Sequence, residues 1–381
     1  MVKNLNQIIS VVTTTLIASS QSFSIKIPQR TIPIITPSTD SESSSGPQLQ
    51  FDIGCVANPV VLPPFDLSDE NGEWQCYYYG NAGSWNGGRK CFLPTGSSGL
   101  ATSTDGITFS KVTGVNPDGS ILSPSHDGSE EWDEIQTGVG DVVRIDKDEL
   151  HMYYFGGSAE ELTFGPGTIA GFRMRIGRAK SFDNGRTWTK DDSYLLDYDE
   201  SEGFFASWPR IVIHDDDDNQ QPWSMYYHSF DGNKWRVFRS ESFDKGDTWN
   251  RTGLILEGGK SEDDFDFSGI GTRSVIKWKT GYLMIYEGVD KNSKHRLGAA
   301  FSKDGKKNWM KLNDGKPILE PGGGPLGEWT KQVIGTPFVV NMPDGSLRLF
   351  HCAKESGDSK MAIGVVESKS GEIGPDCWTA L

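Results

Sequence analysis

Carboxylates beside aromatic rings stand ahead of several apolar segments of this chain. They occur as Phe51-Asp52, Trp132-Asp133 and Phe265-Asp266, and as Glu328-Trp329 at a later point. Two carboxylates that face one ligand can act as the acid and the base in the cleavage of a glycosidic bond, and tryptophan rings stack on sugar rings. The same dipeptides could instead act as structural braces. The elements that position them decide between these two roles.

A short turn phrase repeats along the chain. Its full form, Ser-x-Asp-x-Gly-x-Thr-Trp, stands at 181–188 and 242–249, looser copies begin at Ser103 and Ser302, and a degraded copy runs from Ser368 to Trp378. A recurring period of this size indicates a repeat architecture. Aspartate and glycine favour a tight turn, and the aromatic residue anchors the strand that follows. Each copy therefore predicts a hairpin between the two outer strands of a sheet.

Strand signals precede these copies in a constant order. An apolar strand comes first, an aromatic strand comes second, and a third strand leads into the turn, as in 211–213, 224–228 and 236–239. This pattern predicts four antiparallel strands in about 60–70 residues, repeated five times. We therefore predict an all-β chain that forms a five-bladed β-propeller over residues 51–381, with the two ends of the chain meeting in one blade.

The innermost strands of a propeller line a central funnel, and their early residues face it. The five aligned segments are 57–60, 138–141, 207–210, 271–274 and 335–338. From these segments and the loops before them, the predicted ligand-binding residues are Asn58, Trp208, Arg210, Arg273, Asp133 and Asp266. For each arginine, the alternative is an ion-paired residue that faces away from the funnel.

Charge narrows the range of partners. The formal net charge is −15, and residues 1–46 hold three basic against two acidic side chains, so the acidity belongs to the rest of the chain. An acidic body argues against general binding of nucleic acids or anionic membranes. It suits a neutral sugar or a cationic ligand. We expect a monomer without stable membrane insertion, cofactor or metal, and we interpret the acidic run 214–219 as a solvated loop rather than a calcium site.

The order of these motifs resembles the five-bladed propeller glycosidases: arabinanases, β-xylosidases and, more distantly, invertases and levansucrases. In those families the second innermost strand carries a Pro-Asp-Val type motif ahead of a Tyr-Tyr strand. Gly140-Asp141-Val142-Val143, followed by the strand that ends in Tyr153-Tyr154, matches it in order and spacing. The resemblance covers nearly all of the chain after residue 50. It implies a divergent glycoside hydrolase that acts on a carbohydrate in the funnel.

The resemblance also implies roles for three carboxylates. Asp141 would orient the substrate or tune the acid, and Glu202, although a few residues early, would be the general acid. The first family motif is of the His-Asp-Pro type and supplies the base or nucleophile, but Asn58 stands at that place here. Either Asp52 substitutes from the preceding loop, or the protein lacks hydrolase activity.

Two other interpretations stay open. The propeller could be a non-catalytic module that binds a carbohydrate or a protein, because Asn58 replaces the expected acid and a fold does not settle a function. A glycoside phosphorylase or a sialidase-like enzyme would instead use basic residues to bind phosphate or a carboxylate. Arg210 and Arg273 would suit that role.

The amino-terminal segment differs in kind from the rest. Lys3 precedes the short apolar run 8–18, and Ser20 and Ser22 are the small residues that a signal peptidase reads. The following stretch, rich in Ser, Thr and Pro, has the composition of a chain that does not fold alone. The order resembles the bipartite plastid presequence of algae with secondary plastids, with Phe23 directly after the cut. We predict a signal peptide at 1–22, a transit-like segment at 23–50 and a plastid location; secretion is the alternative.

Five cysteines cannot all pair within one chain. Cys76 and Cys91 flank one predicted hairpin and could be neighbours, and ring closure would bring Cys55 towards the carboxyl-terminal pair, Cys352 and Cys377. We expect a bridge in a secreted protein and free thiols in a plastid stroma. The spacing of cysteines and histidines shows no zinc motif.

Overall fold

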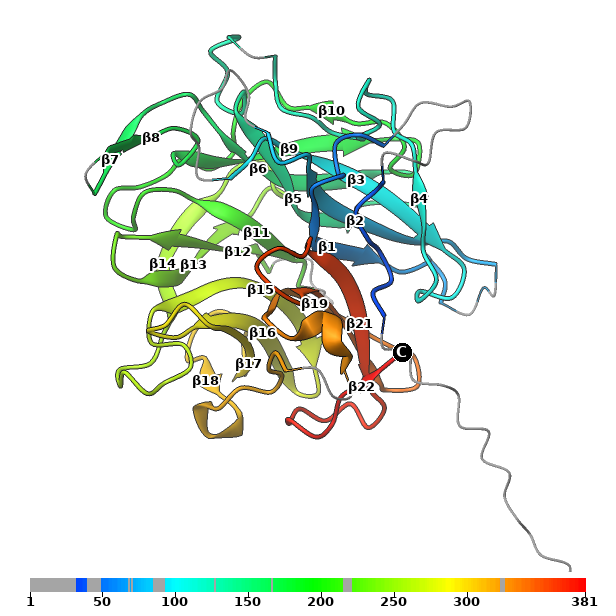
Figure 1. Ribbon diagram of the computed structural model, residues 1–381, viewed down its shortest axis with the longest axis vertical. Helices are drawn as coiled ribbons and strands as arrows, with labels where there is room; N and C mark the ends of the chain where they lie inside the picture. The colour runs from blue at the N-terminus through cyan, green and yellow to red at the C-terminus, as the bar shows by residue number, and fades with distance from the viewer. Residues whose placement is uncertain are drawn as a thin grey trace, which may run out of the picture.

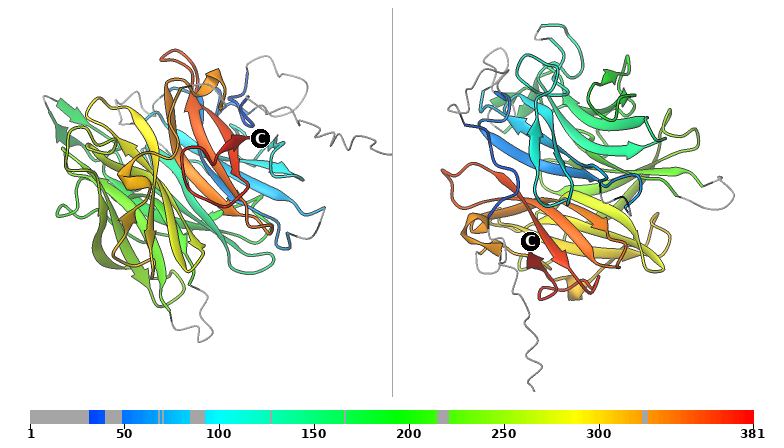
Figure 2. Two further views of the ribbon diagram at one scale, coloured as in Figure 1. Left: turned by 90° about the horizontal axis from the view of Figure 1, so that it is seen from below. Right: turned by 90° about the vertical axis from the view of Figure 1, so that its right-hand side faces the viewer.

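The computed structural model describes residues 32–39, 49–67, 69, 71–84, 93–126, 128–165, 167–214, 221–322 and 326–381. These residues form five four-stranded antiparallel units around a central axis, as Figure 1 and Figure 2 show. One parallel pairing, between Trp235 and Gly269, joins the third and fourth units. The architecture is a five-bladed β-propeller, and the predicted fold class is confirmed.

Each blade runs outward from the axis in chain order. Blade 1 contains β1 (Cys55–Leu62), β2 (Trp74–Asn81), β3 (Gly96–Ser103) and β4 (Ser110–Val112). Blade 2 contains β5 (Gln136–Arg144), β6 (Leu150–Gly157), β9 (Met174–Ser181) and β10 (Thr189–Lys190), with the hairpin of β7 (Leu162–Phe164) and β8 (Gly167–Ile169) inserted after β6. Blade 3 contains β11 (Ser207–Val212), β12 (Trp223–Phe230), β13 (Trp235–Ser242) and β14 (Asn250–Glu257).

The last two blades follow the same plan. Blade 4 contains β15 (Gly269–Trp278), β16 (Gly281–Val289), β17 (His295–Ser302) and β18 (Met310–Lys311), and the 3-10 helix η2 (Asn313–Gly315) follows it. Blade 5 contains β19 (Val333–Asn341), β20 (Leu347–Lys354), β21 (Ala362–Ser368) and β22 (Thr379–Ala380), preceded by the 3-10 helix η4 (Glu328–Thr330). The innermost strands β1, β5, β11, β15 and β19 contact one another in a closed ring.

The two ends of the chain meet in blade 5, as the repeat predicted. Ile35 forms an isolated bridge with Ile363 of β21, on the strand that also pairs with β22 near the carboxyl end. Ile34 and Ile35 are buried in the core cluster between blades 5 and 1. In blades 1, 2 and 4 a later part of the same blade makes the equivalent bridge, through Leu122, Leu196 and Leu319. Part of the segment expected to be transit-like therefore belongs to the propeller core.

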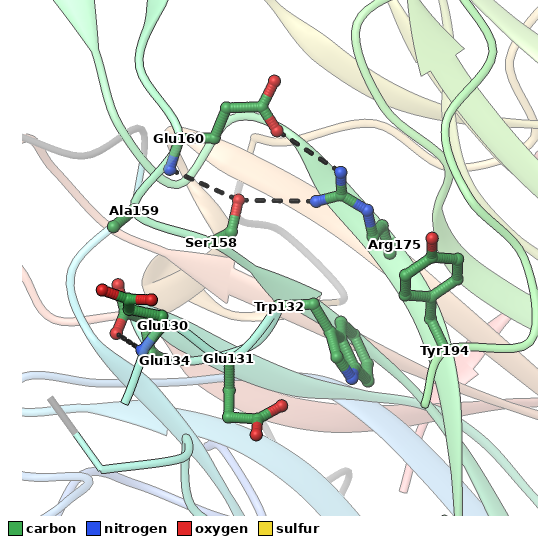
Figure 3. A pocket seen from close by; sticks show the side chains of 9 residues that line it. All are labelled: Glu130, Glu131, Trp132, Glu134, Ser158, Ala159, Glu160, Arg175 and Tyr194. Carbon is green, nitrogen blue, oxygen red and sulfur yellow. Dashed lines mark hydrogen bonds and ion pairs between the residues drawn. The ribbon is translucent and has the colours of Figure 1, made fainter. Parts of the chain in front are cut away.

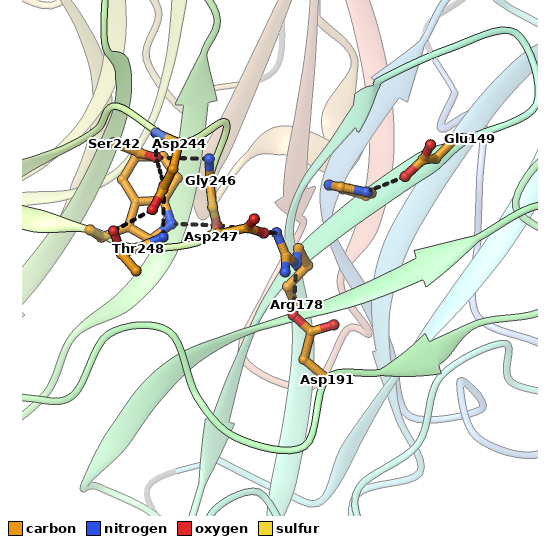
Figure 4. A network of polar contacts seen from close by, with 10 residues as sticks. Glu149, Arg178, Asp191, Ser242, Asp244, Gly246, Asp247 and Thr248 are labelled. Carbon is orange, nitrogen blue, oxygen red and sulfur yellow. Dashed lines mark hydrogen bonds and ion pairs between the residues drawn. The ribbon is translucent and has the colours of Figure 1, made fainter.

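The repeated turn phrase joins the third and fourth strands of its blade, as predicted. In blade 3 the Ser242 hydroxyl accepts the Gly246 N–H at 2.7 Å, and Asp244 accepts the N–H and the hydroxyl of Thr248 at 2.8 and 2.6 Å (Figure 4). Burial opposes the charge of Asp244, but the hydrogen bonds that Thr248 and the Ser242 hydroxyl donate to it lower its pKa to about 2. The Trp249 ring then packs edge-on against Tyr153 of blade 2, 6.0 Å between centroids. The turn thus fastens one blade to the next.

A second link between blades 2 and 3 is ionic. Arg178 of β9 binds Asp191 of its own blade at 2.7 Å and Asp247 of the blade 3 turn at 2.8 Å (Figure 4). Its Nη1 also donates to the carbonyl of Gly246 at 3.2 Å. Because Arg178 is buried, these charge-assisted hydrogen bonds fix the position of the blade 3 turn relative to blade 2.

The cysteines of the described chain are free thiols. Cys55 of β1 and Cys352 of β20 contact the same core cluster, as ring closure predicted. Burial raises the pKa of Cys55 to about 11, so its thiol stays protonated at neutral pH. Cys76 is fully buried, and its expected neighbour Cys91 lies outside the described residues.

Candidate ligand site in the propeller funnel

Each innermost strand interrupts its pairing with the second strand at the same point. The interruptions lie at 57–60, 139–141, 207–210, 270–273 and 335–338. Asn58, Trp208 and Thr336 occupy three of these bulges with φ of 51°, 50° and 45°, and each precedes a proline. Such backbone is costly and persists only where the surrounding structure fixes it, and a bulge re-aims a side chain. Trp208 and Thr336 face the funnel as a result.

The second strand of every blade places one residue beside this interruption. The equivalent residues are Tyr79, Phe155, His228, Glu287 and Cys352. Blades 1 and 2 supply aromatic rings at this position, and blade 5 supplies a buried thiol. The imidazole and the carboxylate come from blades 3 and 4, so the ionisable side of the funnel lies there.

A cavity of about 410 Å³ opens at that side of the funnel. We define the funnel pocket by its described lining residues, Leu93, Trp208, His228, Trp235, Gly271, Thr272, Glu287, Val289, Ser293, His295 and Thr336. The two tryptophans provide apolar faces, and a carboxylate, two imidazoles and three hydroxyl groups provide polar contacts. Apolar walls with a few converging polar groups are typical of small-molecule sites.

Glu287 is the carboxylate of the funnel pocket, and four groups surround it. Its Oε1 lies 2.6 Å from Nδ1 of His295, and its Oε2 accepts the Thr336 N–H at 3.1 Å and the Thr272 hydroxyl. The buried Arg273 adds a further positive charge nearby. Burial opposes ionisation of Glu287, but the bonds from His295, Thr272 and Thr336 lower its pKa below the ordinary value. Glu287 is therefore an ionised acceptor that ties blade 4 to blade 5.

The aromatic wall of the funnel pocket is built on His228. Its ring stacks on Trp208, with 5.1 Å between centroids and 13° between planes, and meets Trp235 edge-on at 5.5 Å. The Nδ1 atom accepts a hydrogen bond from Arg273 at 3.2 Å. Burial and the Arg273 charge hold the pKa of His228 well below 6.5, so its imidazole stays neutral. It orients Trp208 and Trp235 rather than carrying charge.

Two buried arginines form the floor beneath the pocket. Arg210 donates from Nε to the Arg273 carbonyl at 2.8 Å, reaches Asn58 Oδ1 at 3.4 Å, and lies 5.0 Å from the Phe338 ring. Asn58 in turn donates its side-chain amide to the carbonyl of Val139. Arg210 therefore connects blades 3, 4, 5 and 1 through its contacts with Arg273, Phe338 and Asn58.

Asp141 lies near Arg210 and is not among the residues that line the funnel pocket. Its carboxylate accepts the backbone N–H groups of Val142 at 2.9 Å and of Ile211 at 2.7 Å, so it joins blades 2 and 3. Burial raises the pKa of Asp141 to about 6, against the opposing effects of the Arg210 charge and these hydrogen bonds. Asp141 is a buried titratable group of the funnel floor.

The three aspartates of the aromatic–Asp pairs occupy one repeated position. In blades 1, 2 and 4 the aspartate accepts a hydrogen bond from a tyrosine of the second strand and forms an ion pair with a lysine of the fourth strand. The sets are Asp52 with Tyr78 at 2.9 Å and Lys111 at 2.5 Å, Asp133 with Tyr154 at 3.2 Å and Lys190 at 2.6 Å, and Asp266 with Tyr286 at 3.1 Å and Lys311 at 2.6 Å. These contacts are those of structural braces within a blade.

Packing around each brace explains its sequence pattern. The aromatic residue before the aspartate stacks on the same tyrosine, as Trp132 does on Tyr154 at 5.3 Å. A Cβ added at Gly177 of the third strand would approach the Trp132 ring to 2.5 Å, and one added at Gly156 would approach Asp133 to 2.3 Å. The glycines therefore make room for the pair.

Glu202 holds the same position in blade 3. Its two oxygens accept the Tyr227 hydroxyl at 3.0 and 2.8 Å, and Oε2 pairs with Arg251 of β14 at 3.2 Å. Burial raises the pKa of Glu202, whereas Tyr227 and Arg251 act in the opposite direction. In this blade glutamate and arginine thus replace the aspartate and lysine of the other braces.

The structure brings together part of the predicted site. Asn58, Trp208, Arg210, Arg273 and Asp141 meet around the funnel floor, although of these only Trp208 lines the pocket. The four brace carboxylates, Asp52, Asp133, Glu202 and Asp266, do not line it and share no described hydrogen-bond partner with Asp141. The predicted three-carboxylate centre is therefore not assembled by these contacts.

Among the pocket residues that the sequence did not predict are His228, Trp235, Glu287 and His295. A signal for two of them was present. His228 and Glu287 each directly follow the brace tyrosine of their second strand, Tyr227 and Tyr286. A strand alternates its faces, so the residue after the brace tyrosine must face the opposite side, which is the funnel.

A second cavity, of about 390 Å³, lies on blade 2 beside Trp132 (Figure 3). Carboxylates surround it, but Glu160 pairs with Arg175 at 3.3 Å, and Glu134 accepts the N–H of Glu130 at 3.0 Å. Nowhere in the described part of the chain do three or more potential metal ligands converge. Of the acidic run at 214–219 only His214 is described, and it bonds Ser224 and Tyr282.

Comparison with solved structures shows what the fold shares with known proteins. A thermostable family-43 glycoside hydrolase matches with a TM-score of 0.59 and 16% identity, over 88% of this chain and 97% of that one. A glycosyl hydrolase from Bacteroides ovatus matches with a TM-score of 0.59 and 18% identity, over 91% and 94%. A structure from the GH130 family of mannoside phosphorylases, described as containing glycoside hydrolases that target β-1,2 mannosidic linkages in Candida mannan, matches with a TM-score of 0.57 and 18% identity, over 92% and 95%.

At these identities the similarity is one of fold, and the expected resemblance to five-bladed propeller glycosidases is confirmed at that level. No protein-family model and no curated protein sequence matches the chain. Among the helices of the described residues, none has the length and apolar character needed to span a membrane.

Proposed function

We propose that this protein binds a carbohydrate in the funnel pocket. The observation that carries the proposal is the joint placement of the Trp208 and Trp235 rings with the ionised Glu287 in one cavity at the propeller axis. Aromatic faces stack on the C–H faces of a sugar ring, while a carboxylate accepts its hydroxyl groups. The shared fold with glycoside hydrolases supports the same ligand class.

Cleavage by paired carboxylates is a separate hypothesis. Retaining and inverting glycosidases need two carboxyl groups that flank one glycosidic bond. Within the described residues the funnel pocket contains one, Glu287, whereas Asp52 and Glu202 are engaged in braces and Asp141 binds backbone N–H groups outside the pocket lining. We therefore place binding ahead of hydrolysis by Asp52, Glu202 and Asp141.

Binding is tested with a panel of soluble oligosaccharides by isothermal titration calorimetry. For any sugar that binds, Trp235→Ala should weaken affinity roughly two- to tenfold, because the lost ring contact is worth roughly 0.5–1.5 kcal/mol. Phe182→Ala removes an exposed ring on blade 2 and should leave affinity unchanged. Equal affinities in the two variants would place the ligand elsewhere.

Turnover is tested separately with chromogenic pentosides, fructosides and hexosides, with and without phosphate. Hydrolysis by the predicted carboxylates requires Asp141→Asn and Glu202→Gln to abolish product formation. Product that depends on phosphate would favour the phosphorylase alternative, in which Arg210 and Arg273 act on the anion. A sugar that binds without turnover under any condition would favour a binding module.

We also propose that the precursor is cut upstream of Ile34. If the whole predicted transit-like segment, residues 23–50, were cleaved off, the mature protein would lose Ile34 and Ile35, which are buried in the core cluster between blades 5 and 1. A fluorescent fusion of residues 1–50 distinguishes a plastid from secretion, and replacing Phe23 with alanine should stall plastid import. Mass spectrometry of the mature amino terminus then locates the cut.

A further inference from the structure

His295 stands at the rim of the funnel pocket with one ring nitrogen committed and the other available. It is the first residue of β17, and about one third of its side chain is exposed (34%). Its Nδ1 lies 2.6 Å from Glu287 Oε1. An ionised carboxylate can only accept, so Nδ1 carries the proton of this hydrogen bond. Among the described residues Nε2 has no hydrogen-bond partner.

The partner of this imidazole is held in place from two blades. Glu287 is fixed by the Thr272 hydroxyl of β15 and by the Thr336 N–H of β19. A carboxylate anchored in this way sets the tautomer and the orientation of the imidazole that it binds. The pair therefore has the geometry of a carboxylate–histidine dyad, and the histidine that carries the free nitrogen lines the cavity.

The charges around the dyad favour a proton on His295. Burial disfavours the imidazolium, but Glu287 and Asp290 overcome this effect, and the pKa of His295 rises above 6.5. Arg273 and the Cys352 thiol are the other titratable groups that face Glu287 from neighbouring strands. His228, the second imidazole of the pocket, is buried against Arg273 and neutral, so it offers no comparable proton.

We propose that His295 is the proton-transfer group of the funnel pocket and that Glu287 is its positioning residue, acting on a glycosidic oxygen of a bound carbohydrate. This proposal rests on the proposed function for its ligand. In hydrolysis the Nε2–H proton goes to the leaving oxygen as the bond to the anomeric carbon breaks. The oxygen of a water forms the new bond to that carbon, and a proton of the water returns to Nε2.

The dyad is tested first by chemical labelling. Diethyl pyrocarbonate acylates unprotonated, accessible imidazoles, and mass spectrometry assigns the sites. Four of the six histidines, His151, His214, His228 and His351, are at most 8% exposed, whereas His126 is exposed and serves as an internal reference. His295 should be labelled with a midpoint above pH 6.5. Glu287→Gln should lower that midpoint by about one pH unit, and Glu320→Gln, an exposed carboxylate of the same blade, should not move it.

Turnover provides the second test, on whichever glycoside of the chromogenic panel is cleaved. His295→Gln should reduce kcat about 10²–10⁴-fold, the usual contribution of a general acid. Glu287→Gln should shift the basic limb of the pH–rate profile downwards. A His295 that resists labelling, a midpoint that ignores Glu287→Gln, or absence of turnover across the panel would overturn the proposal.

Failure of the ligand and failure of the dyad are separable. A sugar that binds by calorimetry and shields His295 from labelling, but is never cleaved, overturns proton transfer and leaves the binding function intact. A glycoside that is cleaved with the expected loss in His295→Gln supports proton transfer. If no sugar binds while His295 titrates as expected, the proposed function fails together with the proton transfer that rests on it, and only the dyad geometry is confirmed.

Discussion

Two kinds of buried carboxylate occur in this propeller, and the contrast between blade braces and the funnel pocket separates structure from chemistry. Asp52, Asp133 and Asp266 are at most 1% exposed, and each is closed between a tyrosine and a lysine of its own blade. Glu287 is 8% exposed, lines a cavity, and shares its oxygens with His295 and with two neighbouring strands.

The difference teaches that the partner, rather than burial or residue type, distinguishes the two roles. A lysine on the outer strand neutralises a brace aspartate inside one blade, where no ligand has access. The partner of Glu287 is an imidazole that itself faces the cavity, so the charge of the pair can act on a bound molecule. Variants that remove a brace carboxylate or the funnel-pocket carboxylate, but not both, test this distinction.

The largest expected effect is on stability, from breaking a brace. Asp133→Ala leaves Lys190 and the Tyr154 hydroxyl without their acceptor, and removing one partner of a buried pair costs roughly 3–5 kcal/mol. Urea unfolding followed by tryptophan fluorescence measures the loss. Glu131→Ala, an exposed carboxylate two positions earlier in the chain, should change stability by less than about 0.5 kcal/mol. Similar midpoints for the two variants would contradict the brace interpretation.

A smaller effect concerns the pH dependence of stability through Asp141. Its pKa is about 6 in the folded state and about 3.9 when unfolded, so between these values the folded protein binds the extra proton. Stability from this group is fully present below about pH 4 and is lost as the pH rises through 6, by on the order of 2–3 kcal/mol. In Asp141→Asn this part of the decline between pH 4 and 7 should disappear. A decline that persists unchanged would assign it to other groups.

The smallest expected effect separates binding from stability in blade 4. Glu287→Gln removes a charged acceptor from the funnel pocket and should weaken sugar affinity roughly 10- to 150-fold, since a hydrogen bond to a charged group contributes roughly 1.5–3 kcal/mol. Asp266→Asn alters a brace of the same blade and should lower the melting temperature without changing affinity in the folded state. Thermal unfolding gives the melting temperature of each variant, and isothermal titration calorimetry below that temperature gives its sugar affinity. The reverse result would exchange the roles of the two carboxylates.

The sequence by itself determined the fold. The Ser-x-Asp-x-Gly-x-Thr-Trp phrase, the strand order and the five aligned inner segments are local signals, because turns and strand alternation depend on residues close in the chain. The aromatic–Asp pairs were equally local signals, but the sequence did not decide whether they act in catalysis or as structural braces. Their tyrosine lies one strand further out and their lysine at the blade edge, so only the folded blade joins them.

The funnel pocket was decided by tertiary structure alone. Glu287, Thr272, Thr336 and His295 come from four strands of two blades, and their sequence separations of up to 64 residues carry no periodic signal. Positive-φ bulges re-aim one residue in three of the five inner strands, which alternation does not predict. Ile35 likewise reaches Ile363 only because the ring closes. Local sequence specifies the repeated blade, whereas a ligand site on the propeller axis is specified by which residues five blades bring to a common centre.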